Sequence, residues 1–184
     1  MGLLESCKAG DQSAWRRLFQ LHARSVYRWA VMMGLPPAEA EDAAQEVLAV
    51  AIRKIDQCRE EQGLKPWLFR ITKHIVANAR RKAWFRRGVL KGDPPEPAFD
   101  PGSIPSRESE LSVRRCLSLL PAKQQEVLIL SDVEGHTREE VAEILGIPAG
   151  TVASRLRLAR RGFLKEWERS SFIATGRPTP NSNP

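Results

Sequence analysis

Proline and glycine interrupt the chain in one short stretch. Eight of them fall within eighteen positions between Gly88 and Pro105, and no helical period survives there. Proline fixes φ and biases the residue before it away from the helix, so this stretch is expected to be extended. We therefore predict two small domains, 1–87 and 111–169, joined by a Pro/Gly-rich linker at 88–110. Residues 170–184 lack periodicity and are predicted to form a disordered tail.

Charge is distributed unevenly between these parts. Lys and Arg number 29 and Asp and Glu 22, which gives a net charge of +7. The predicted linker is acidic, whereas both domains are basic, as is typical of proteins that bind a polyanion. No apolar run approaches the length of a membrane span, and the first residues do not resemble a signal peptide. Three isolated cysteines favour neither a disulfide framework nor a zinc cluster, so we expect a cytoplasmic protein without membrane insertion.

The first domain has the apolar spacing of helices. Steps of three and four residues predict a helix after Asp11, its N-cap, with a buried stripe formed by Trp15, Leu18, Phe19, His22, Val26, Ala30 and Met33. Further helices are predicted at 38–55 and 67–85. Nothing alternates as a strand does, so the fold class is predicted to be all-α.

The second domain carries a sharper local signal. Helices are predicted at 111–120 and 121–133, and Thr137 and Glu140 have the spacing of a capping box that begins a third helix. That helix should end at Gly146, where a left-handed residue is easily accommodated. Another helix is predicted to begin near Thr151. A helix, a glycine-centred turn and a basic helix form the helix-turn-helix arrangement.

The basic helix after Thr151 is a candidate DNA-binding element. Its first four turns carry arginines and no acidic residue before Glu166. An arginine fork can pair with guanine in the major groove, and a threonine at the start of a helix can contact phosphate. The alternative is that these arginines only keep the domain soluble.

The helix predicted at 67–85 and the residues that follow it are also basic. Seven lysines and arginines occur between Trp67 and Arg87 without an acidic residue, and aromatic residues are interleaved with them. Such surfaces suit single-stranded bases. The alternative is that the aromatics belong to the core. That reading is favoured for Trp67, and both readings are left open for Phe69 and Trp84.

Acidic residues instead cluster near the N-terminus of the helix predicted at 38–55. Negative charge near a helix N-terminus is favourable by itself, so the group could be structural or could be a protein-contact surface. The three histidines are scattered, and catalytic motifs are lacking. We therefore predict no catalytic residue, no cofactor and no metal site.

Four segments in a fixed order resemble one protein family. AGDQSAWRRLF, EDAAQEVLAVAIRKID, KPWLFRITKHIVANARRK and the segment from LLPAKQQEVLIL through GIPAGTVASRLRLARRGFLKEW are similar to those of the extracytoplasmic-function (ECF) sigma factors of bacterial RNA polymerase. The resemblance covers roughly 8–87 and 112–168. It implies a promoter-specificity subunit that binds RNA polymerase core and promoter DNA, and that has a cognate anti-sigma factor as a further partner.

The resemblance also assigns roles to individual residues. Asp42, Gln45 and Glu46 would dock on the clamp helices of the largest polymerase subunit. The minus-ten promoter element would be recognised and opened by the loop 57–66 and one face of the helix after it, through Arg59, Lys65, Arg70, Lys73, His74, Asn78 and Arg81. The second domain would read the minus-thirty-five element as duplex and touch the polymerase flap, with DNA contacts from Arg138, Thr151, Ser154, Arg155, Arg157 and Arg161.

This chain departs from the family pattern in four places. His74 stands where asparagine is usual and Asn78 where aspartate is frequent, while Ala153 and Leu158 replace residues that are often basic or polar. The promoter sequence therefore does not follow from the resemblance. Two other functions compete with the sigma-factor reading: a regulator that binds only duplex DNA, and an enzyme acting on nucleic acid.

Overall fold

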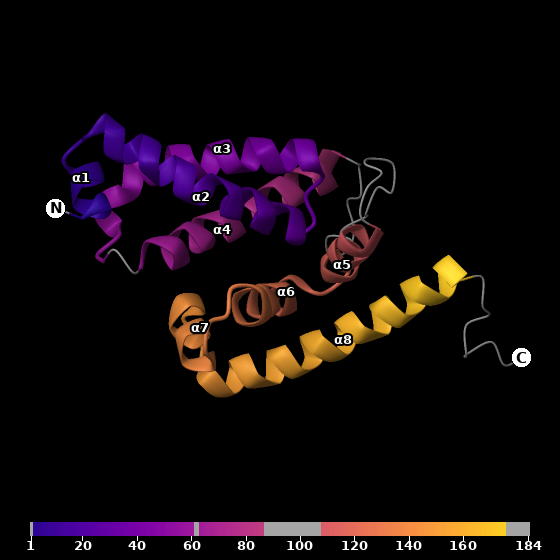
Figure 1. The fold of residues 1–184 in the computed structure, drawn as a ribbon. Helices are drawn as coiled ribbons and strands as arrows, with labels where there is room; N and C mark the ends of the chain where they lie inside the picture. Colours follow the sequence, from indigo (N-terminus) through magenta and orange to yellow (C-terminus); the bar gives the residue numbers. More distant parts are fainter. Residues whose placement is uncertain (1, 61–62, 87–107, 176–184) are drawn as a thin grey trace, which may run out of the picture. The chain divides into compact units, whose positions relative to one another are not determined.

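A computed structural model describes residues 2–60, 63–86 and 108–175 (Figure 1). The chain divides into two compact units, Met1–Pro95 and Glu96–Pro184. Within the described ranges every regular element is helical, which confirms the predicted all-α class. Most of the predicted linker and residues 176–184 lie outside the described residues. None of the described helices is both long and apolar enough to cross a membrane.

Unit 1 is built from three long helices that lie side by side (Figure 1). Its elements are α1 (Leu3–Lys8), α2 (Gln12–Met32), α3 (Pro37–Lys54), the 3₁₀ turn η1 (Ile55–Gln57) and α4 (Leu64–Arg86). Their apolar stripes meet in one core, where Trp29 of α2 and Phe69 of α4 pack edge to face with ring centroids 5.2 Å apart. The arrangement leaves the outer faces of α3 and α4 to solvent.

The start of α2 follows the sequence prediction. The Asp11 carboxylate accepts a hydrogen bond from the Ser13 backbone N–H at 2.8 Å. Bonds from Ser13 lower the pKa of Asp11. The turn into α3 uses Gly34 at φ 95°, a conformation that glycine adopts without strain, and Pro37 occupies the first helical position.

Unit 2 packs shorter helices against one long helix. Its elements are α5 (Glu108–Ser118), α6 (Ala122–Leu128), the π-helical segment η2 (Ile129–Val133), α7 (Arg138–Leu145) and α8 (Ala149–Thr175). The helix α8 contacts α5, α6 and α7. The buried Gln125 side chain donates to the carbonyls of Leu117 and Ser118 at 2.9 and 3.1 Å, which ties α6 to the end of α5.

Several predicted boundaries are wrong. The helix α8 continues to Thr175, so residues 170–175 are helical where a disordered tail was predicted. The helix α5 already begins at Glu108, inside the predicted linker. The predicted helix 121–133 is α6 followed by η2, and Pro121 is its N-cap. Short α1 was not predicted at all, because six residues are too few for a periodic signal.

Candidate polymerase-binding and nucleic-acid-binding surfaces

The outer face of α3 presents the acidic group. Asp42, Gln45 and Glu46 are three and four positions apart, which places them on one side of the helix, and all three are exposed. On the other side, Ala43 and Val47 are buried against the core. The structure therefore brings the three predicted polymerase-binding residues together on one surface.

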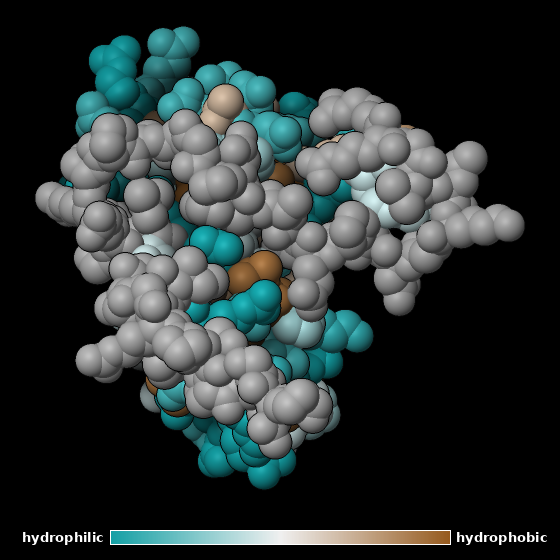
Figure 2. All heavy atoms as spheres, turned by 90° about the vertical axis from the view of Figure 1, so that its right-hand side faces the viewer, coloured by the Kyte–Doolittle hydropathy of each residue, from teal (hydrophilic) through white to brown (hydrophobic). Residues whose placement is uncertain are grey.

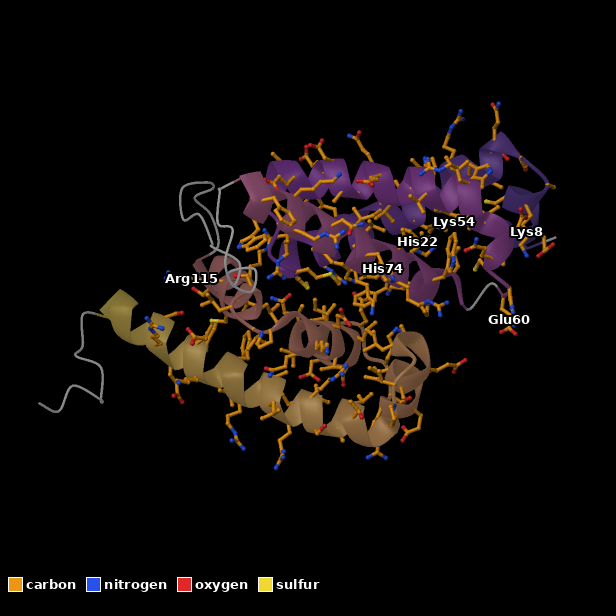
Figure 3. The ribbon with its side chains drawn as sticks, turned by 180° about the vertical axis from the view of Figure 1, so that it is seen from behind. Lys8, His22, Lys54, Glu60, His74 and Arg115 are labelled. Carbon is orange, nitrogen blue, oxygen red and sulfur yellow. The ribbon has the colours of Figure 1, made fainter. Side chains whose placement is uncertain are left out.

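The helix α4 is divided into a buried and a basic side. Trp67, Leu68 and Phe69 are at most 7% exposed, so Trp67 and Phe69 belong to the core and stack on no base. The exposed side carries four of the predicted DNA-binding residues, Arg70, His74, Asn78 and Arg81, while Lys65 and Lys73 are half-buried. Figure 3 labels His74 on this helix.

Asn78 and Arg81 act as a pair. The Arg81 guanidinium donates from Nη2 to Asn78 Oδ1 at 2.9 Å. The bond uses the amide oxygen of Asn78 and leaves its N–H₂ group as a donor. These two residues therefore present several N–H donors outward, and donors suit phosphate oxygens and the acceptor atoms of bases.

A cleft of about 480 Å³ separates the acidic and basic faces of unit 1. One wall is Asp42 and Glu46 of α3, the other is Asn78, Arg81 and Lys82 of α4. The sequence did not predict this juxtaposition, because it depends on how α3 and α4 pack. Two of the predicted polymerase-binding residues, Asp42 and Glu46, thus share one cleft with two of the predicted DNA-binding residues, Asn78 and Arg81.

The loop before α4 is held by short-range contacts in its described part. The Cys58 thiol lies 3.6 Å from the Glu60 carbonyl, and the Gly63 N–H donates to the same carbonyl at 3.1 Å. Arg59, between Cys58 and Glu60 in sequence, is exposed.

His22 of α2 lies near Lys65 at the start of α4 and is half-buried (Figure 3). Burial and the nearby Lys65 charge disfavour its protonated form, so the pKa of His22 is lowered.

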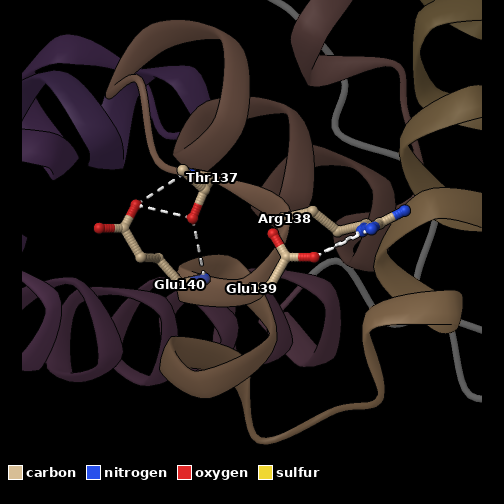
Figure 4. Close-up of polar contacts among 4 residues, drawn as sticks. All are labelled: Thr137, Arg138, Glu139 and Glu140. Atoms are coloured by element: carbon tan, nitrogen blue, oxygen red, sulfur yellow. Dashed lines mark hydrogen bonds and ion pairs between the residues drawn. The ribbon is translucent and has the colours of Figure 1, made fainter.

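The helix-turn-helix of unit 2 is confirmed by its geometry. Thr137 N donates to Glu140 Oε2 at 2.7 Å, and Glu140 N donates to Thr137 Oγ1 at 3.3 Å, which completes the capping box at the start of α7 (Figure 4). These bonds lower the pKa of Glu140. Gly146 ends α7 at φ 64° and ψ 40°, the left-handed conformation predicted for it.

The predicted recognition residues of α8 lie in different environments. Arg157, Arg161 and Ser154 are exposed, whereas Thr151 and Arg155 are half-buried. The Ser154 hydroxyl donates to the Thr151 carbonyl at 3.0 Å, within its own helix. The opposite side of α8 packs inward through Val152 and Ala159 and the half-buried Leu156, Phe163 and Trp167.

Two arginines near this surface are engaged by carboxylates. Arg160 donates through Nε and Nη2 to the two oxygens of Asp132, at 3.0 and 2.7 Å, a bidentate pair that joins α8 to η2. This pair raises the pKa of Arg160. Arg138, a predicted DNA contact, donates to Glu139 Oε1 at 2.9 and 3.0 Å and lowers the pKa of that carboxyl (Figure 4).

An apolar groove of about 350 Å³ lies beside the Arg160 pair, and it was not predicted from the sequence. Its walls come from α5, α6, η2 and α8, and include Val113, Leu117, Val133, Phe163 and Leu164. Grooves of this kind bind the apolar face of an amphipathic helix.

Across the described residues, no group of three or more His, Cys, Asp or Glu side chains is arranged to hold a metal ion.

Two family regions match the two units. Residues 18–86 match the family described as "Sigma-70 region 2", and residues 110–161 match "Sigma-70, region 4". The first region spans α2 to α4, and the second spans α5 to the middle of α8. The two surfaces described above therefore fall within the two matched regions.

Similar proteins cover most of the chain. The ECF RNA polymerase sigma factor SigM of Mycobacterium tuberculosis is 30% identical over 162 residues, which is 86% of this chain and 79% of that one. RNA polymerase sigma factor NccH of Alcaligenes xylosoxydans xylosoxydans is 30% identical over 158 residues, 82% of this chain and 85% of that one.

Solved structures show the same fold. The sigma factor RpoE in complex with the anti-sigma factor NepR from Bartonella quintana aligns with a TM-score of 0.66 at 25% identity, over 83% of this chain and 96% of that chain. CnrH in complex with the cytosolic domain of CnrY gives 0.67 at 22% identity, over 91% and 96%. With both regions present in order and relatives matched over most of their length, the chain belongs to the ECF sigma factors of the sigma-70 family of RNA polymerase.

Proposed function

We propose that this protein directs core RNA polymerase to specific promoters by dividing the work between its two units. Unit 1 binds polymerase and opens the minus-ten element, and unit 2 reads the minus-thirty-five element as duplex. The observation that carries this proposal is the separation of charge in unit 1, where acidic α3 and basic α4 face each other across one cleft. The acidic wall suits a protein partner and not duplex DNA, because acidic groups repel phosphates.

Polymerase docking is assigned to Asp42, Gln45 and Glu46. The three side chains are exposed together on α3, and their helix is fixed from behind by buried Ala43 and Val47. Two carboxylates on a rigid helix suit a basic partner surface, for which complementary charge sets the rate and specificity of association.

Minus-ten recognition is assigned to Arg59 and to the exposed side of α4. Lys65, Arg70, Lys73 and Arg81 supply positive charge for phosphates, while His74 and Asn78 are four positions apart and can both donate to a base edge. These residues act on the separated strand without breaking any covalent bond. Members of this family regulate initiation without catalysis, and we assign no catalytic group.

Minus-thirty-five recognition is assigned to the helix-turn-helix. Arg157 and Arg161 are exposed on α8, with Thr151, Ser154 and Arg155 nearer its start. Arg138 at the first position of α7 would give up its bond to exposed Glu139 to contact a phosphate.

The protein would act in the cytoplasm, where polymerase and chromosome are found.

An anti-sigma factor is proposed as a further partner. The solved structure of RpoE contains the bound anti-sigma factor NepR, and that of CnrH contains the cytosolic domain of CnrY. The apolar groove of unit 2 is a surface on which an amphipathic helix of such a partner would bind.

Binding to core polymerase tests the docking assignment. Asp42→Arg with Glu46→Arg should abolish association of the full chain with core polymerase, because it reverses the charge of the docking face. Glu143→Arg with Glu168→Arg makes the same change in net charge at exposed acids of unit 2 and should leave association intact. Circular dichroism must show both variants folded. Normal association of the first variant would overturn the assignment.

A further inference from the structure

The outer face of α2 carries a row of residues to which no role has been assigned above. Arg17, Leu21, Arg24 and Arg28 follow one another at steps of four, three and four, so they lie on one side of the helix, and all four are exposed. At 1.5 Å per residue the row is about 17 Å long. These four residues are called the α2 row below.

The charge on this helix is of one sign. The 21 residues of α2 include four arginines and no Asp or Glu. Arg17 and Arg24 are paired with no carboxylate in the part of the chain that the structure describes. Arg24 and Arg28 are one turn apart, and like charges at that spacing disfavour a helix. A face with unneutralised charge of one sign favours a negatively charged partner.

Leu21 gives information through its position, not through its exposure. Seven large apolar side chains are exposed in the described ranges, and the part of the surface that is not grey in Figure 2 is mostly hydrophilic with apolar atoms in small patches. Single exposed apolar side chains are normal and indicate no partner by themselves. Leu21, however, lies within the row, between Arg17 and Arg24. The partner therefore meets an apolar side chain flanked by positive charges.

This combination fits a protein helix better than nucleic acid. Phosphate oxygens are bound by hydrogen-bond donors, and single-stranded bases stack on aromatic rings, but Leu21 offers neither. The exposed side of α4 differs, because His74 and Asn78 can donate to bases there. Steps of four, three and four are also the spacing at which one helix packs along another.

We propose that the α2 row docks an acidic amphipathic helix of a partner protein distinct from core polymerase. Carboxylates of that helix face Arg17, Arg24 and Arg28, and an apolar side chain covers Leu21. The row shares no residue with the docking group of α3 or the basic side of α4. The inference therefore goes beyond the proposed function and does not depend on it.

A designed peptide serves as the probe. It is a labelled helix of about 18 residues made of Ala, Leu and Glu, in which Leu and Glu repeat at steps of three and four. A peptide of the same composition in scrambled order controls for charge alone. The full-length wild-type chain should bind the patterned peptide, and should bind the scrambled one roughly tenfold more weakly.

Substitution of the arginines tests the charge of the row. Arg17→Glu with Arg24→Glu should lower affinity for the patterned peptide by roughly tenfold or more, because like charges then face each other. Arg17→Ala with Arg24→Ala should cause a smaller loss. Lys123→Glu with Lys165→Glu makes the same change in net charge as the glutamate variant, at exposed lysines of unit 2, and should bind as the wild type does. Circular dichroism must show each variant folded.

Leu21→Ala separates helix docking from attraction between charges. This substitution removes apolar surface and keeps every arginine, so affinity for the patterned peptide should fall several-fold. Affinity for labelled DNA, single-stranded or duplex, should stay at the wild-type value because no phosphate contact is lost. A patterned peptide with Lys in place of Glu should bind Arg17→Glu with Arg24→Glu better than it binds the wild type.

The proposal is overturned if the wild type does not bind the patterned peptide in preference to the scrambled one. Normal peptide binding by Arg17→Glu with Arg24→Glu, or by Leu21→Ala, also overturns it. If the arginine variants lose DNA affinity and keep peptide affinity, the row is a phosphate-binding surface instead. If they lose association with core polymerase, the row is a polymerase contact and the proposed partner is wrong.

Discussion

Arginine side chains on α8 are held in two different ways, and this difference predicts what each one does. Arg157 is exposed, whereas Arg160 is fixed by the two oxygens of Asp132. A guanidinium already bound by a carboxylate has few donors left for a base. Position on the helix alone, without this contact, would have made both arginines DNA-binding candidates.

Alanine substitutions should separate these arginines. Arg155→Ala and Arg157→Ala are each expected to weaken minus-thirty-five duplex binding by about 1–3 kcal/mol, near tenfold or more, and to relax preference at one position. Arg160→Ala should lower thermal stability and leave base preference unaltered. Binding to a duplex library at fixed salt gives all three profiles. Unchanged profiles for both Arg155→Ala and Arg157→Ala would contradict the recognition-helix assignment.

His74 offers a second residue-level test. Its side chain is on the exposed side of α4, four positions before Asn78. We expect His74→Asn to change base preference at the minus-ten positions, because a different donor geometry would face the base edge. Sequencing of transcripts from a promoter library reports this preference. A profile identical to that of the wild type would mean that His74 contacts no base.

At the scale of single elements, the capping box fixes where α7 begins. Thr137→Ala removes the side chain that accepts from Glu140 N, and loss of an N-cap costs about 1 kcal/mol. Thermal unfolding of the full chain should show the transition that involves unit 2 shifted down by a few degrees. Thr137→Ser keeps the hydroxyl and should restore the wild-type transition. An unchanged transition in Thr137→Ala would show that packing alone fixes α7.

Glu140 makes this element sensitive to acid. Its pKa in the folded protein is lowered from 4.5 by the bonds from Thr137, so the folded state favours the carboxylate. The stabilisation is therefore present above pH 4.5 and is lost as the pH falls through the lower, folded value. Glu140→Gln should reduce this part of the pH dependence. Chemical denaturation at a series of pH values measures it, and equal slopes for both proteins would contradict the prediction.

Local signals predicted the caps well, whereas contacts between elements could not be predicted. Asp11, Thr137 and Gly146 act through their immediate neighbours, so residue type and spacing were sufficient. The Arg160–Asp132 pair joins residues 28 positions apart and depends on how α8 packs on η2. The α3–α4 cleft and the apolar groove depend on packing in the same way.

Helix ends without a clear stop signal were also missed. No glycine or proline lies between Ser170 and Thr175, and α8 continues through that stretch although it lacks a periodic apolar pattern.

Burial of the aromatic residues of α4 could not be predicted from residue type and neighbouring charge. Phe69 and Phe85 share a residue type and a basic context, yet Phe69 is in the core and Phe85 is exposed, a difference that only the packing of α2 against α4 decides.

At the scale of the whole molecule, polymerase binding and duplex recognition are assigned to separate units. The full-length variant Asp42→Arg with Glu46→Arg should therefore bind minus-thirty-five duplex at least as well as the wild type, although it no longer binds core polymerase. Added positive charge can only favour DNA, so retained affinity is expected at every salt concentration. Gel-shift titration gives the affinities. A large loss of duplex binding by the folded variant would contradict this division.

The most direct measurement is run-off transcription by core polymerase and this protein on a library of randomised promoters. We predict transcription that depends on the added protein, from templates sharing two conserved elements, with wild-type output exceeding that of Asp42→Arg with Glu46→Arg. Variants of α4 should shift the minus-ten consensus and variants of α8 the minus-thirty-five consensus. Transcription that is no greater with the protein than with core polymerase alone would contradict the account.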